Sequence, residues 1–311
     1  MKKLTIFVLS LVLALSFTAC GKDVKRTSGG IVDQTVDKNT VSLVNDAYKA
    51  TGDAIKSASA LGYTANYKKE VAIDDTTTAS RLTRTYDFIT GAAGKTFSYS
   101  EAARSDTVST TMKMYDDLKY IYGYYADTEY IITRNDSSAA FINALPESLE
   151  LVDGTAFAVK DTIVVDTDGG GHGFVLEYEP TDKNFKPDEV YGPLYAETEL
   201  APTAVGLRIS GIIDASGKIT SETVTYTFTY PIETEVVKDD VDPDNSGVSA
   251  TEKVTKTVKV TLTAEYTFNY ALDAVAVPDG ITVVPETAEG EEKPQLPKEL
   301  SITDFTKLMG N

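Results

Sequence analysis

The chain has 311 residues and carries 47 Asp and Glu against 29 Lys and Arg, which gives a formal net charge of −18 at pH 7. This charge argues against nucleic acid as a partner, because phosphate binding requires clustered lysines and arginines. With 42% hydrophobic and 24% charged residues the chain has a globular rather than a disordered composition, and one histidine and one cysteine are too few for a zinc site.

The first twenty residues have the layout of a bacterial secretion signal. Lys2 and Lys3 form a basic start, and residues 4–17 form an apolar run that is shorter than the roughly 20 residues needed to span a bilayer. The run ends in Phe17, followed by Thr-Ala and Cys20. This ending resembles the lipobox of bacterial lipoproteins, in which small residues precede a cysteine that is lipidated and becomes the new N-terminus. The usual lipobox has leucine where Phe17 stands.

The lipobox resemblance implies a signal peptide over residues 1–19 and a lipid anchor on Cys20, which would hold the protein outside the cytoplasm on the bacterial cell membrane. A diacylated cysteine buries enough methylene groups for stable anchoring, whereas a single chain binds marginally. An ordinary signal peptide followed by an incidental cysteine is the alternative. Residues 20–39 are polar and lack a periodic pattern, so they predict a flexible tether before a single domain over residues 40–311.

The first predicted element of that domain is a helix over residues 41–60. Apolar residues recur there at steps of three and four, and Thr40 is in place for an N-cap. After Leu61 the apolar period changes to two, which is typical of strands. Further strands are predicted near residues 82–88, 95–101, 107–115, 118–125, 129–134, 155–166, 173–179 and 205–213, with a short helix over 139–145 and a closing helix after Ser301.

Two long segments give the clearest strand pattern. Over residues 223–232 and 254–270 valine, leucine, tyrosine and phenylalanine alternate mainly with threonine. One buried face and one wet face are typical of an antiparallel sheet. A strand of that second length would reach about 56 Å at roughly 3.3 Å per residue, so the sheet is predicted to curl around its apolar side.

A helix that runs into residues 63–71, a hairpin over 207–230 and the sequence from Tyr266 to Pro285 together resemble the LolA/LppX-like lipoprotein carrier superfamily. The resemblance implies a mainly β (α+β) fold. Its strongly curved antiparallel sheet, a half-barrel, has an apolar face covered by an N-terminal helix and a few short helices, and some members bind acyl chains there. The carrier itself is a soluble shuttle without an anchor, and the acidic loop at 238–250 is not part of the family pattern.

The acidic loop offers the only candidate metal site. Asp240, Asp242 and Asp244 alternate like the first ligands of a calcium loop. However, Gly247 falls two places late, and Glu252 lies one residue beyond the usual bidentate ligand. The alternative is a solvated hairpin tip that prevents edge-to-edge pairing. No other cofactor is predicted.

Two further features bear on chemistry. His172 follows three glycines, so we expect an exposed histidine at a flexible hairpin tip rather than a member of a catalytic triad. The tyrosine-rich run over residues 120–125 is interpreted as one packed sheet face with hydroxyls that reach water. The alternative is an aromatic patch that faces a ligand or a partner.

Three functions remain open at this point. The first is a membrane-anchored, non-enzymatic lipoprotein that binds a lipid or another lipophilic molecule in the concave apolar face of its sheet. The second is an anchored β-rich surface module that contacts another protein without a ligand cavity. A hydrolase is the third, and it is the least favoured because the sequence marks no acid pair as buried.

Overall fold

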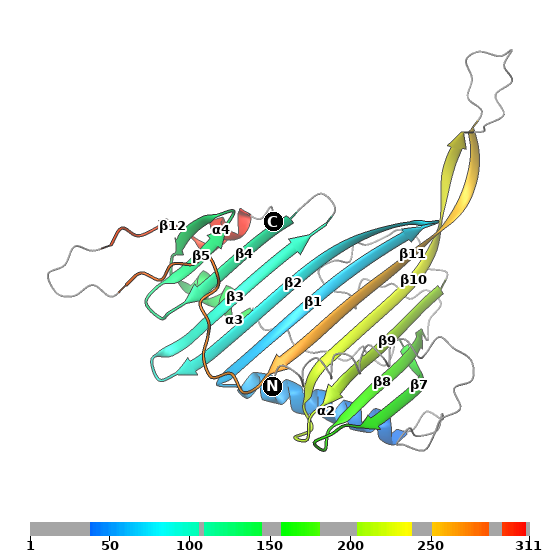
Figure 1. Ribbon diagram of the computed structural model, residues 1–311, viewed down its shortest axis with the longest axis horizontal. Helices are drawn as coiled ribbons and strands as arrows, with labels where there is room; N and C mark the ends of the chain where they lie inside the picture. The colour runs from blue at the N-terminus through cyan, green and yellow to red at the C-terminus, as the bar shows by residue number, and fades with distance from the viewer. Residues whose placement is uncertain are drawn as a thin grey trace, which may run out of the picture.

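The computed structural model describes residues 38–105, 109–144, 157–180, 204–237, 251–285 and 294–308, and these build one twelve-stranded sheet with three helices. Figure 1 shows the strands side by side, with the long helix α2 lying across one face. The mainly β prediction is therefore confirmed, whereas the strong curl into a half-barrel stays a prediction. The elements are α2 (Lys38–Ser57), β1 (Ala60–Ile73), β2 (Thr76–Gly91), β3 (Gly94–Arg104), β4 (Ser109–Asp116), β5 (Ile121–Tyr125), β6 (Thr128–Ile132), α3 (Asp136–Ala144), β7 (Phe157–Asp166), β8 (His172–Pro180), β9 (Ala204–Ile213), β10 (Ile219–Val237), β11 (Thr251–Asn269), β12 (Lys298–Leu300) and α4 (Ile302–Lys307).

The sheet is built from two series of hairpins that meet in its middle. Its strand order is β12-β6-β5-β4-β3-β2-β1-β11-β10-β9-β8-β7. Every described neighbouring pair is antiparallel except β12 with β6, which is parallel. The central seam joins β1 to β11, so strands from both ends of the domain lie side by side there.

The covered face of the sheet is the one against which α2 packs. It carries the buried apolar side chains of alternate strand residues, in two clusters. Val44, Ala47 and Tyr48 on α2 pack on the cluster over β8–β11, whereas Ile55 packs on the cluster over β1–β5. The apolar stripe of α2 therefore packs against the sheet, as its helical spacing predicts. The helix begins at Lys38, so the prediction of Thr40 as its N-cap is wrong.

The closing helix α4 is confirmed and has a regular start. The Ser301 hydroxyl accepts a hydrogen bond from the Asp304 backbone N–H at 3.1 Å, which caps the helix. Phe305 is fully buried on the covered face, and a Cβ added at Gly123 of β5 would lie only 2.7 Å from its ring. Glycine at this position therefore lets α4 approach the sheet.

We expect Gly123→Ala to destabilise the fold by roughly 1–3 kcal/mol, because the added methyl group would overpack the site under the Phe305 ring. Gly206→Ala is the matched control. Gly206 also lies in a strand, and nothing stands within 4 Å of its added Cβ. Urea denaturation measures both variants, and equal midpoints would contradict the close packing of α4.

The opposite face of the sheet carries the threonines of the two long strands. Thr225, Thr227 and Thr229 lie on this face, whereas Tyr226 and Phe228 between them are buried on the covered face. The predicted facing of the strand is therefore confirmed. Figure 1 shows the ends of β10 and β11 projecting past the other strands as a two-stranded ribbon. We call residues 231–237 and 251–257 the projecting ribbon.

The tyrosine-rich run lies on both faces, not on one as predicted. Tyr122 is buried on the opposite face, where its hydroxyl donates a 3.1 Å hydrogen bond to Asp117 and accepts one from the Val284 N–H. Ile281 packs beside Tyr122, so a segment from the C-terminal part of the chain covers this ring. Tyr125 belongs to the covered face. Residues 281–284 of the same chain therefore cover part of this aromatic patch.

Candidate functional site

A row of polar side chains crosses the covered face, whose buried side chains are mainly apolar. Glu101 of β3 pairs with Arg84 of β2, which pairs with Ala65 of β1, then Tyr266 of β11 and Glu222 of β10. Paired residues in adjacent strands point to the same side of a sheet, so these five side chains share one face. We call Glu101, Arg84, Tyr266 and Glu222 the polar row.

One end of the polar row is a half-buried charge network. Arg84 Nε donates to Glu101 Oε2 at 2.6 Å, and the Tyr99 hydroxyl donates to the same oxygen at 2.8 Å. The guanidinium also lies 5.9 Å from the centre of the Tyr67 ring. Burial, together with the charge of Glu101, raises the pKa of Tyr99, so this hydroxyl stays a donor. The carboxylate is thereby satisfied by two donors.

The middle of the row is aromatic. The Tyr67 and Tyr266 rings meet edge to face with centroids 5.9 Å apart, and their hydroxyl oxygens are 3.4 Å apart. Ala65 between Arg84 and Tyr266 is fully buried and is the smallest of these five side chains. Polar hydroxyls are thus held at the level of the row while the rings keep the surroundings apolar.

Glu222 ends the row and is buried without a polar partner. Its side chain is 4% exposed and makes no hydrogen bond or ion pair with the described residues. Beside it, Gly211 leaves room for the Phe174 ring, which stands 2.8 Å from where a Cβ would be. Burial raises the pKa of Glu222 to about 8, because an apolar environment disfavours the charged form. At neutral pH the carboxyl is mainly protonated.

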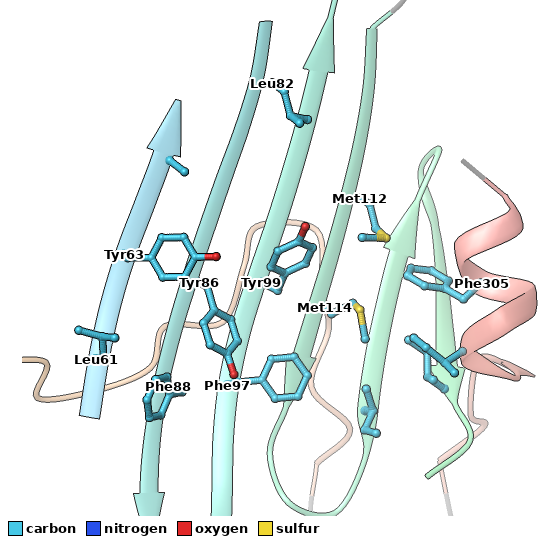
Figure 2. Packing of buried hydrophobic residues seen from close by; sticks show 14 of the residues in the cluster. Leu61, Tyr63, Leu82, Tyr86, Phe88, Phe97, Tyr99, Met112, Met114 and Phe305 are labelled. Carbon is cyan, nitrogen blue, oxygen red and sulfur yellow. The ribbon is translucent and has the colours of Figure 1, made fainter. Parts of the chain in front are cut away.

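Other buried hydroxyls on this side of the sheet also lack a hydrogen-bond partner among the described residues. They belong to Tyr48 on α2 and to Tyr86 on β2. Figure 2 shows Tyr86 among Tyr63, Phe88 and Phe97, all buried, and burial raises its pKa. Buried polar groups in proteins nearly always find a partner in protein, water or ligand. These hydroxyls and the Glu222 carboxyl therefore mark places where a bound molecule can supply hydrogen bonds.

Sequence reasoning missed the polar row, although the pattern contained a signal for it. Glu222 is in phase with Val224, Tyr226 and Phe228, and Arg84 is in phase with Leu82 and Tyr86. A charged residue in phase with buried neighbours is informative because burial of an unpaired charge is costly.

The site residues predicted from the sequence lie elsewhere. Cys20 and the three aspartates Asp240, Asp242 and Asp244 are outside the described residues, so the lipid anchor and the calcium site stay predictions. Within the described ranges no group of three or more His, Cys, Asp and Glu residues is arranged to hold a metal ion. His172 opens β8 rather than sitting at the turn tip, and its Nδ1 lies 3.0 Å from Asp166 Oδ1. The prediction that His172 lies at the tip of the hairpin is therefore wrong, because the turn precedes it at residues 168–170.

Comparisons with known proteins give no family for this chain. No family model and no curated protein matches the sequence. Among solved structures, a DUF1329 family protein from Desulfovibrio piger is 11% identical with a TM-score of 0.21, over 76% of this chain and 94% of that one. MucB in complex with periplasmic MucA is 6% identical with a TM-score of 0.16, over 72% of this chain and 93% of that one. A second MucA/MucB complex, from Pseudomonas aeruginosa, is 5% identical with the same TM-score and the same coverage.

These low scores assign neither a family nor a function to this chain. Membership of the LolA/LppX-like superfamily stays a prediction. Among the described helices none is long and apolar enough to cross a membrane.

Proposed function

We propose that this protein is a non-enzymatic lipoprotein, anchored outside the cytoplasm through Cys20, that holds a lipophilic molecule bearing a polar group against the covered face. The observation that carries the ligand part is that the buried hydroxyls of Tyr48 and Tyr86 and the buried Glu222 carboxyl have no hydrogen-bond partner among the described residues, within a mainly apolar, aromatic face. Ligand sites combine apolar walls with a few placed polar groups.

We propose that the ligand reaches this site along the polar row. Its Arg84 and Glu101 end is half-buried, with side chains 24% and 16% exposed, whereas Glu222 at the other end is buried, with 4% exposed. A molecule that enters from the exposed end would pass the Tyr67 and Tyr266 rings, which offer apolar contact, before its polar group reaches Glu222. The row thus runs from a half-buried ion pair to a single buried carboxyl.

The spacing of the row also supports a role other than hydrolysis. Glu101 and Glu222 are four strand spacings apart, about 19 Å at roughly 4.8 Å per strand. The paired carboxyls of glycosidases stand no more than about 9.5 Å apart, because both must reach one bond. These two acids cannot share that task.

Native mass spectrometry of the full chain purified from its own host tests the proposal. We expect a noncovalent adduct that is released by mild collisional activation and leaves the mass of the lipidated chain. The apolar lining predicts that the adduct is extracted by organic solvent. A clean mass without an adduct across several preparations would contradict ligand binding.

Labelling of cells with an alkyne fatty acid tests the anchor. We expect Cys20→Ala to lose the label, because the thiol is the group that takes the diacylglyceryl chain in the lipobox reading. Lys22→Ala, two residues further on, should keep it. Label that persists in Cys20→Ala would refute the lipid anchor.

A protein-contacting module is the second candidate function, and the projecting ribbon favours it. Val236 and Val254 are large apolar side chains that are 43% and 38% exposed there. Apolar residues on a protruding element are typical of contact surfaces. Absence of any ligand in the mass measurement would favour this second function.

A further inference from the structure

We infer that the polar row selects amphiphiles whose head group is an amine, and that Glu222 is the group that holds the amine. The inference rests on the proposed function, since it names the class of ligand for the same site. The inference follows from which polar groups of the row already have a hydrogen-bond or ion-pair partner among the described residues and which do not.

The only cation of the row is already engaged. Arg84 binds Glu101 at 2.6 Å and lies against the Tyr67 ring, and Glu101 accepts a second hydrogen bond from Tyr99. An anionic head group would have to displace this network to reach the guanidinium. Fatty-acid carboxylates and phosphate head groups are therefore disfavoured at this end.

The surroundings of Glu222 favour a donor and reject an anion. Gly211 from β9 and Tyr266 from β11 flank it in the sheet, with Phe174 beyond Gly211. Tyr48, on the stripe of α2 that packs over this cluster, is the titratable group on the helix side. None of these groups carries a positive charge, so nothing here would neutralise a second anion. An ammonium, by contrast, would gain the carboxylate and the faces of aromatic rings.

Binding of an ammonium should be coupled to proton release. Glu222 has a pKa of about 8, so at lower pH the carboxyl must lose its proton to form an ion pair with a cation. Affinity for an amine should therefore rise by up to about tenfold per pH unit below that pKa. Affinity for a neutral alcohol should change little over the same range.

The experiment compares three probes with one chain length, dodecylamine, dodecanol and dodecanoate, each below its micelle concentration. Calorimetry at pH 6, 7 and 8 on the full chain should show dodecylamine binding at least tenfold tighter than the other two, with the preference growing as pH rises. Glu222→Gln keeps the volume of the side chain but removes the charge. It should bring the affinity for dodecylamine down to that for dodecanol.

Glu265→Gln is the matched control, because Glu265 lies in β11 next to the row but is exposed on the opposite face. It should leave all three affinities unchanged. Equal binding of the three probes, or a preference for amine that survives in Glu222→Gln, would overturn the inference and leave the proposed function standing. Failure of every probe to bind would overturn both. A melting curve for each variant confirms that it is folded.

Discussion

Glu222→Gln is expected to stabilise the folded protein above neutral pH and to remove a fall in stability between about pH 4.5 and pH 8. Burial raises the pKa of Glu222 from 4.5 to about 8 in the folded state. Between these values the unfolded chain releases the proton while the folded chain retains it. The unfolded state then binds fewer protons, so the free energy of unfolding falls as pH rises and levels off above the folded pKa.

The expected slope is about 1.4 kcal/mol per pH unit, which is the free-energy equivalent of one pKa unit. Over the whole window the wild-type chain should lose several kcal/mol relative to Glu222→Gln, a large share of the roughly 5–15 kcal/mol that stabilises a typical domain. Glutamine has no ionisable carboxyl, so the free energy of unfolding of Glu222→Gln lacks this dependence on pH.

Denaturant unfolding at pH 5, 6, 7, 8 and 9 measures the difference between the two proteins, which cancels the contributions of other titrating groups. Glu265→Gln, on the exposed side of β11, should follow the wild-type curve. A difference between wild type and Glu222→Gln that does not vary with pH would show that the carboxyl is not buried in the folded state.

Phe228→Asp is expected to prevent folding altogether. Phe228 is 2% exposed, lies 5.6 Å from the centre of the Tyr226 ring and stacks on Tyr230 at 6.1 Å. Truncating a buried phenylalanine costs roughly 3–5 kcal/mol. An aspartate in its place would also have no partner in an apolar cluster, which adds several kcal/mol. The sum approaches or exceeds the stability of a typical domain.

Circular dichroism and a thermal melt test this directly. The variant should lack a cooperative transition, whereas Thr227→Asp, one residue earlier and on the opposite face, should melt close to wild type. A normal melt of Phe228→Asp would mean that the covered face has been assigned to the wrong side of β10.

The sequence pattern is informative where a strand has one buried and one wet face. In β10 and β11 threonine occupies the wet positions so regularly that the facing of Tyr226 and Phe228 could be predicted from alternation alone. The short strand β12 was missed, because three residues carry no periodic signal and its parallel partner β6 lies far away in the chain. Alternation also says nothing of strand order, so the pairing of β1 with β11 could not be predicted.

The candidate site was harder to predict than the strands. Glu222 and Arg84 are each visible as charges in phase with apolar neighbours, but their alignment in one row depends on the registers of four strand pairs. A shift of one residue in any of these would send a side chain to the other face. The lipobox resemblance, by contrast, rests on adjacent residues, so the prediction of an anchor at Cys20 requires no knowledge of the fold.

The seam between β1 and β11 has a consequence for how the molecule matures. Tyr63 faces Phe268 across it, so the centre of the sheet is contributed by residues that leave the ribosome near the beginning and near the end of synthesis. The two halves of the sheet can join only after both β1 and β11 have been synthesised. Contacts between such distant parts of a chain form slowly, because a long loop must close first. Slow closure would leave time for the proposed export before the sheet has formed.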